Sequence, residues 1–121
     1  MLTYRTTRIR FPVFADYSVR VVVSKDIESA LLLYKETREF NLGGTTEAMA
    51  IHVDDGRSFL FLEPGASPGT IAHETWHVVQ HMLEYFQVDI EAEIVAYHLG
   101  YLVDKIYPFV HKSSRRPSTP R

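Results

Sequence analysis

The sequence predicts an α+β fold: a small antiparallel or mixed sheet of three to four strands, one helix before a hairpin, and two helices at the C-terminal end. Apolar residues alternate with polar ones in 17–23, which is typical of a half-buried strand. Two further apolar runs, 49–53 and 59–62, flank turn residues. Two longer segments follow, 68–86 and 89–107, and each begins at residues that favour a helix start.

Composition is consistent with one domain. The chain has 121 residues, of which 45% are hydrophobic, enough for a single core that we expect within residues 1–110. Residues 111–121 are rich in Ser, Arg and Pro, and we expect a disordered tail there. The net charge of −2 gives no electrostatic reason to expect nucleic acid or a membrane as a partner. With no apolar run long enough to span a bilayer and no signal peptide, we expect a cytoplasmic protein. The sequence leaves its oligomeric state open.

The first half of the chain supplies two strands and a helix. A short strand is expected at 9–13, interrupted by a proline, and a longer one at 17–23. Ser24 or Asp26 then offers an N-cap for a helix that we expect to end at the glycine pair 43–44.

The second half begins with a hairpin and continues with the two long helices. Residues 54–57, Asp-Asp-Gly-Arg, form a plausible turn between the two apolar strands. Ser67 followed by Pro68 favours a helix start. The serine hydroxyl can accept a hydrogen bond from an unpaired amide of the first turn, and the N–H that proline lacks would have no partner at that position. Asp89 is the expected cap of the last helix, which we expect to stop before Pro108.

The first of these long helices carries His73-Glu74-Thr75-Trp76-His77, an HExxH motif. Histidines four residues apart on a helix point the same way and can share one zinc ion, while Glu74 can act as a general base on a water bound to that ion. With six histidines and nine glutamates in the chain, the chance of an accidental HExxH match is roughly one in fifty. The motif therefore needs support from a surrounding helix and from a third ligand. The chain has no cysteine, so any zinc must be held by His, Glu or Asp.

A catalytic zinc site needs a third protein ligand. His81 is excluded in a continuous helix, because it lies about 12 Å from His73 along the axis. Glu93 shares a helix face with a seam of residues expected to pack closely against the motif helix: Ala96, Tyr97, Gly100 and Asp104. Glu91 lies about 160° away on the same helix and remains the alternative ligand.

The order of elements and two local matches resemble a known family. Strand, helix, hairpin, HExxH helix and a helix bearing a glutamate together resemble the minimal gluzincin metallopeptidase core of SprT-like and ImmA/IrrE-like proteins. Residues 70–77 and 93–97 carry the resemblance, and the latter with 100–102 are similar to small metallopeptidase-like proteins encoded by bacteriophages. The resemblance covers about residues 17–107. It implies zinc held by His73, His77 and Glu93 on the two C-terminal helices, with Glu74 as the base.

We therefore expect a zinc-dependent metallopeptidase acting on a protein or peptide. Tyr97 is a candidate catalytic residue, since its hydroxyl could donate to the oxyanion of a tetrahedral intermediate. The edge of the hairpin could bind an extended peptide by strand addition. No appended domain names a substrate, and the connection between the last two helices is short. The alternative is a catalytically inactive protein of this fold that binds or inhibits a protein partner.

Overall fold

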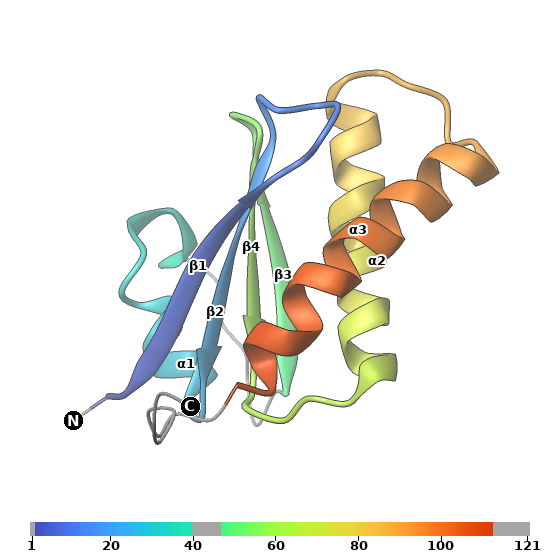
Figure 1. The fold of residues 1–121 in the computed structure, drawn as a ribbon. Helices are drawn as coiled ribbons and strands as arrows, with labels where there is room; N and C mark the ends of the chain where they lie inside the picture. The colour runs from blue at the N-terminus through green and yellow to red at the C-terminus, as the bar shows by residue number, and fades with distance from the viewer. Residues whose placement is uncertain (1, 40–46, 113–121) are drawn as a thin grey trace.

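The computed structural model describes residues 2–39 and 47–112, and it confirms the α+β class (Figure 1). A four-stranded mixed sheet carries a short helix on one face and two long helices on the other. The elements in chain order are β1 (Tyr4–Arg10), β2 (Ser18–Ser24), α1 (Ile27–Leu31), the 3-10 helix η1 (Lys35–Thr37), β3 (Ala48–Val53), β4 (Arg57–Leu62), α2 (Pro68–Tyr85) and α3 (Ala92–Val110).

The strands are ordered β1-β2-β4-β3. β1 pairs antiparallel with β2, β2 pairs parallel with β4, and β3 pairs antiparallel with β4. A parallel pair needs a crossover connection, and the chain between β2 and β4 includes α1, η1 and the outer strand β3. β3 is therefore an edge strand, and α2 lies over this side of the sheet (Figure 1).

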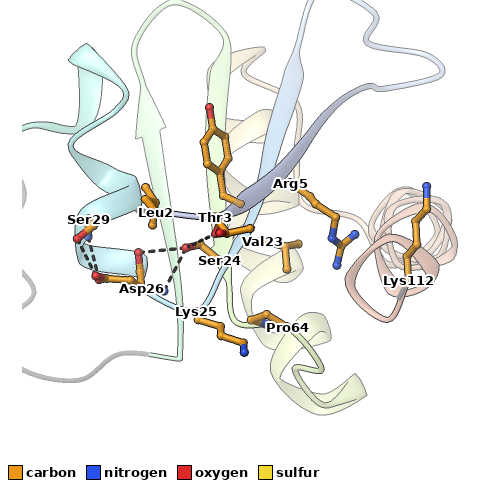
Figure 2. Close-up of a pocket in the computed structure, with 11 residues that line it drawn as sticks. Leu2, Thr3, Arg5, Val23, Ser24, Lys25, Asp26, Ser29, Pro64 and Lys112 are labelled. Carbon is orange, nitrogen blue, oxygen red and sulfur yellow. Dashed lines mark hydrogen bonds between the residues drawn. The ribbon is translucent and has the colours of Figure 1, made fainter. Parts of the chain in front are cut away.

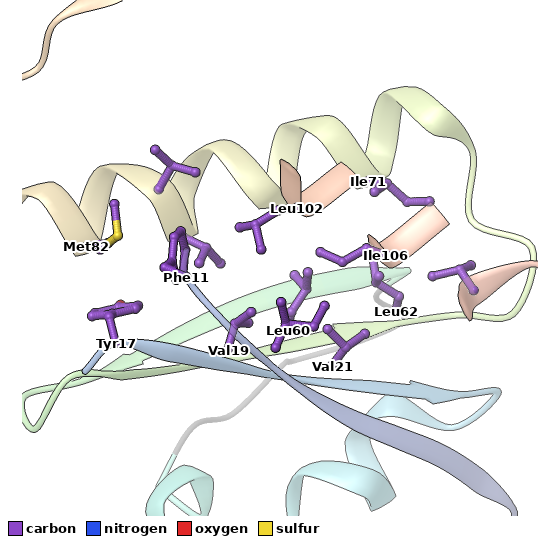
Figure 3. Close-up of a cluster of buried hydrophobic side chains, with 14 of the residues drawn as sticks. Phe11, Tyr17, Val19, Val21, Leu60, Leu62, Ile71, Met82, Leu102 and Ile106 are labelled. Atoms are coloured by element: carbon purple, nitrogen blue, oxygen red, sulfur yellow. The ribbon is translucent and has the colours of Figure 1, made fainter. Parts of the chain in front are cut away.

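Alternation along β2 divides the interior into two clusters. Val21 faces α2 and α3, whereas Val22 faces α1, as successive strand residues do. In the larger cluster, shown in Figure 3, fully buried side chains of β2, β4, α2 and α3 meet: Val19, Val21, Leu60, Leu62, Ile71, Met82, Leu102 and Ile106. This packing fixes the face that α2 presents to the sheet.

The hairpin is confirmed as predicted. Gly56 in its turn has φ +88°, a backbone conformation that favours glycine. The carbonyl of Gly56 accepts a hydrogen bond from the amide of Ser18 at 3.2 Å, which ties the turn to the start of β2. A side chain at Gly56 would also approach the ring of Tyr85 to 3.3 Å.

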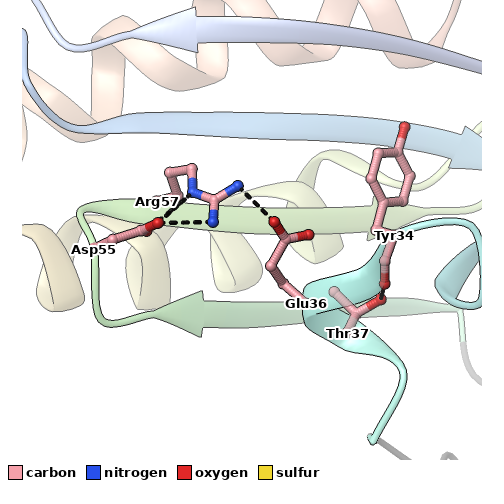
Figure 4. A network of polar contacts seen from close by, with 5 residues as sticks. All are labelled: Tyr34, Glu36, Thr37, Asp55 and Arg57. Carbon is pink, nitrogen blue, oxygen red and sulfur yellow. Dashed lines mark hydrogen bonds and ion pairs between the residues drawn. The ribbon is translucent and has the colours of Figure 1, made fainter.

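Arg57 connects the hairpin to η1 (Figure 4). Its guanidinium pairs with Asp55 at 2.7 Å and with Glu36 at 3.0 Å. Hydrogen bonds from Arg57 lower the pKa of Asp55, whereas the pKa of Glu36 is lowered first by a backbone hydrogen bond and then by Arg57. Because all three side chains are partly exposed, these ion pairs add little to the free energy of folding, and their main effect is to orient η1 relative to the hairpin.

The first predicted helix is shorter than expected. Asp26 is its N-cap and accepts from the amide of Ser29 at 3.1 Å, but the helix ends at Leu31. The hydroxyl of Thr37 donates to the carbonyls of Leu31 and Tyr34, so these terminal groups are satisfied without further helix. The glycine pair 43–44 lies outside the described residues.

Both predicted ends of the last helix were wrong. Glu91, and not Asp89, caps α3 by accepting from the amide of Ile94 at 3.2 Å. The helix also continues past Pro108 to Val110. Arg5 donates to the carbonyls of Phe109 and Val110 at 2.6 and 3.3 Å, which satisfies part of the helix end.

The remaining expectations concern the chain termini. The first strand spans Tyr4–Arg10, earlier and longer than the predicted 9–13. Of the predicted tail, residues 113–121 lie outside the described part of the chain. Within the described residues, no helix has both the length and the apolar content needed to cross a membrane.

Candidate functional site

The HExxH motif lies on α2, where the sequence places it. Ser67 is the N-cap, its hydroxyl accepting from the amide of Thr70 at 3.1 Å, and Pro68 follows in the first turn. The helix is continuous through the motif and ends at Tyr85. The predicted helix start is therefore confirmed.

The two motif histidines lie together on α2, His73 exposed and His77 half-buried. The rings of His73 and His77 have centroids 4.9 Å apart and are nearly perpendicular. The His73 side chain is 67% exposed, whereas that of Glu74 is only 17% exposed. The Glu74 carboxylate lies 4.0 Å from Nε2 of His73. A candidate base is thus held beside two candidate ligands.

The helix face that bears Glu93 does not pack against α2. Glu93 is exposed, and Tyr97 is 55% exposed. The other residues of the seam are exposed as well: Ala96, Gly100 and Asp104. α3 instead buries the opposite stripe, which includes Leu102 and Ile106. The predicted packing of the seam is wrong because large apolar side chains gain more free energy from burial than small ones do.

Neither candidate third ligand joins the histidines. Glu91 is engaged as the N-cap of α3, and Glu93 lies on the exposed face of that helix. The described residues include every His, Asp and Glu of the chain, and no three of them form a group that could hold a metal ion. The side chains present therefore fit two of the three ligands of a zinc site, together with its base.

A second histidine pair lies beside the motif. His52 on β3 stacks on His81 of α2, with ring centroids 4.4 Å apart and planes within 8°. Sequence reasoning recruited neither residue. Two features of the sequence indicate the pair. His81 lies four residues after His77 and so on the same side of the helix, and His52 lies two residues after Ala50 and so on the strand face that contacts the larger core cluster.

Two buried hydroxyls join these histidines. The Tyr17 hydroxyl contacts Nδ1 of His81 and, at 2.5 Å, Oγ of Ser58. Oγ of Ser58 lies 2.9 Å from Nδ1 of His52. Tyr17 and Ser58 are fully buried. The four side chains form one continuous chain of hydrogen bonds beneath α2, which we call the His52–His81 relay.

Burial keeps the relay uncharged. Desolvation, with smaller contributions from the nearby His81 and His77, lowers the pKa of His52 from 6.5 to about 4. Desolvation also lowers the pKa of His81, although Glu84 and Asp54 oppose this. Both rings are therefore neutral at pH 7.

A separate cavity of about 590 Å³ opens where β1 begins and β2 ends (Figure 2). Its lining includes three basic side chains, Arg5, Lys25 and Lys112, and the acidic Asp26. Arg5 is already engaged with the carbonyl groups at the end of α3. No motif residue is among the described residues that line this cavity, so it is distinct from the candidate metal centre.

Comparison with protein-family models, with curated proteins and with solved structures finds no match to this chain.

Proposed function

We propose that this protein is a zinc-dependent peptidase in which His73 and His77 bind the metal and Glu74 is the general base. The observation that supports this most directly is the arrangement on α2. Two imidazoles, one exposed and one half-buried, have ring centroids 4.9 Å apart, and the Glu74 carboxylate lies 4.0 Å from Nε2 of His73. Such a combination is typical of metal-assisted hydrolysis.

The chemistry of these residues follows from their types. A zinc ion held by the two histidines would lower the pKa of a bound water and polarise a peptide carbonyl. Glu74 accepts a proton from the attacking water and delivers it to the nitrogen of the leaving amine. The exposure of His73 allows a peptide to approach, and β3 offers the unpaired edge of an outer strand.

We propose Glu93 as the third ligand and Tyr97 as a donor to the oxyanion. Both lie on the exposed face of α3, one helical turn apart, so a movement that brought Glu93 to the histidines would carry Tyr97 with it. Glu91 is the weaker candidate, because its carboxylate already caps the helix. The cytoplasmic location expected from the sequence belongs to this proposal.

One observation favours a second candidate function. No three of the described His, Asp and Glu residues form a metal-binding group, which would suit a protein that uses this fold only to bind or inhibit a protein partner. Two protein ligands hold zinc less tightly than the three of a catalytic site. Zinc affinity and hydrolysis together separate the two functions.

Hydrolysis of a casein digest or a peptide library by the zinc-supplemented protein tests the proposal. We expect the wild type to cleave, and Glu74→Gln to retain zinc while losing activity by a factor of about 10² to 10⁴. Glu84→Gln is a matched control, since Glu84 is an exposed carboxylate elsewhere on α2. Undiminished cleavage by Glu74→Gln would remove Glu74 as the base, and a wild type that binds zinc without cleaving any peptide would favour the binding protein.

A further inference from the structure

The His52–His81 relay has three hydrogen bonds but only two hydroxyl groups to donate protons to them. Its three hydrogen bonds join His52 to Ser58, Ser58 to Tyr17, and Tyr17 to His81. Each bond needs one proton, and the two hydroxyls supply one each. Both hydroxyls are fully buried and make no other hydrogen bond to a described residue. The third proton must therefore come from a ring Nδ1.

If each buried hydroxyl donates its proton within the relay and both rings are neutral, two arrangements remain. In one, His52 donates from Nδ1 to Ser58, Ser58 donates to Tyr17, and Tyr17 donates to His81. In the other, every bond runs in the opposite direction, from Nδ1 of His81 to Nδ1 of His52. A neutral imidazole carries one proton, so in either case one ring is protonated at Nδ1 and the other at Nε2.

The second nitrogens of the pair point away from the buried hydroxyls. In an imidazole, Nε2 lies across the ring from Nδ1, and Nδ1 of each histidine faces the relay. Neither Nε2 is among the buried atoms that lack a partner in the described part of the chain. With no hydrogen bond to a described residue, each Nε2 therefore keeps some contact with solvent, one as a donor and the other as an acceptor.

We propose that the His52–His81 pair is a binding site for the main chain of an extended peptide residue, with one Nε2–H donating to its carbonyl and the other Nε2 accepting from its amide. The rings are parallel within 8° and 4.4 Å apart, and both Nδ1 atoms face the buried hydroxyls, so both Nε2 atoms lie on the side of the pair away from those hydroxyls. An extended residue offers its N–H and C=O on the same edge, as it does in an antiparallel sheet.

Charge and position support a peptide as the ligand. The pair is uncharged at pH 7 and therefore suits a neutral amide more than a carboxylate or a phosphate. It lies between edge strand β3 and the helix that carries the motif. The identity of the ligand as a peptide rests on the proposed function, whereas the opposite protonation of the two rings does not.

The protonation of the rings is measurable without any ligand. Nitrogen-15 NMR of ¹⁵N-histidine-labelled wild type at pH 7 distinguishes a ring protonated at Nδ1 from one protonated at Nε2. We expect one of each for His52 and His81, or two exchanging forms in which the rings always differ. The same protonated nitrogen in both rings would contradict the relay and with it the proposed site.

Binding is tested with a blocked alanine–glycine pentapeptide, in the Glu74→Gln background so that the peptide stays intact. We expect the peptide to shift the Nε2 signals of both rings, and the fully N-methylated pentapeptide, which lacks amide donors, to bind at least about tenfold more weakly. His52→Ala should weaken binding by a similar factor. His111→Ala is the control, because His111 lies at the end of α3.

Equal binding of the two peptides, or no effect of His52→Ala in a variant with a native circular dichroism spectrum, would overturn the site. Peptide binding by a protein that never hydrolyses would retain the site and reject the peptidase. Hydrolysis that is insensitive to His52→Ala would reject the site and retain the peptidase. The two proposals therefore fail separately.

Discussion

The ring of His52 lies parallel to that of His81, with centroids 4.4 Å apart, and this contact joins the edge of the sheet to α2. Both rings are desolvated, and each is held at Nδ1 by a buried hydroxyl. A proton added to either ring would have to be accommodated beside another imidazole in a partly desolvated site.

Acid should therefore destabilise the protein through His52. Burial lowers its folded-state pKa from 6.5 to about 4, so the unfolded chain takes up a proton that the folded protein does not. The contribution of His52 to stability is complete above pH 6.5 and is lost as the pH falls from 6.5 to about 4. The ring keeps some contact with solvent, and we expect a loss of about 2 kcal/mol, measured by urea unfolding across this range.

His52→Asn is the control for this pH dependence. The asparagine amide can still meet Ser58 but has no proton to gain in this range. The variant should lose less stability than the wild type between pH 6.5 and 5. Parallel curves for the two proteins would show that His52 is not responsible.

Removal of the Tyr17 hydroxyl should also weaken the protein. Tyr17→Phe removes the partner of Nδ1 of His81 and one of the two partners of the Ser58 hydroxyl, which typically costs about 1–3 kcal/mol. Tyr4→Phe is the matched control, because Tyr4 is 42% exposed on β1, and it should change the free energy of unfolding by less than about 0.5 kcal/mol. Equal effects of the two substitutions in chemical denaturation would argue against a structural role for the relay.

Arg5 should stabilise the end of α3. Its guanidinium donates to two terminal carbonyls and lies 5.0 Å from the ring centroid of Phe109. Arg5→Ala should lower the unfolding free energy by about 1–2 kcal/mol, because the charged hydrogen bonds and the stacking are lost together. Arg8→Ala, at an exposed position of the same strand, should have little effect. A similar loss of stability in both variants would indicate a general effect of charge.

Glu91 and Glu93 should differ in their effects on stability. Glu91 caps α3, so Glu91→Ala should cost about 1 kcal/mol in thermal or urea unfolding. Glu93→Ala removes an exposed side chain from the first turn and should cost less than about 0.5 kcal/mol. If Glu93→Ala proved the more destabilising, the helix start observed in the structure would be incorrect.

Local signals in the sequence predicted the elements well. Val19, Val21 and Val23 alternate as a half-buried strand does, and they lie together in the larger core cluster. Ser67 and Pro68 marked the start of α2 because capping depends on adjacent residues alone. The turn around Gly56 was predictable for the same reason.

The orientation of α3 and the relay depend on tertiary packing. The sequence allowed either face of α3 to be buried. In the structure the stripe with Leu102 and Ile106 is buried, and the small-residue seam that bears Glu93 is not. The stack of His52 on His81 requires the position of α2 on the sheet, which no local pattern specifies. The error in the predicted seam and the omission of the relay have this common cause.

Zinc binding by four proteins tests the central claim most directly: the wild type, His73→Ala, Glu91→Ala and Glu93→Ala, each depleted of metal and titrated with zinc in a calorimeter. We predict one zinc ion per wild-type chain, loss of binding in His73→Ala, strong weakening in Glu93→Ala, and unchanged affinity in Glu91→Ala. A wild type that binds no zinc would contradict the account of the motif, and loss of zinc with Glu91→Ala but not Glu93→Ala would contradict the assignment of the third ligand.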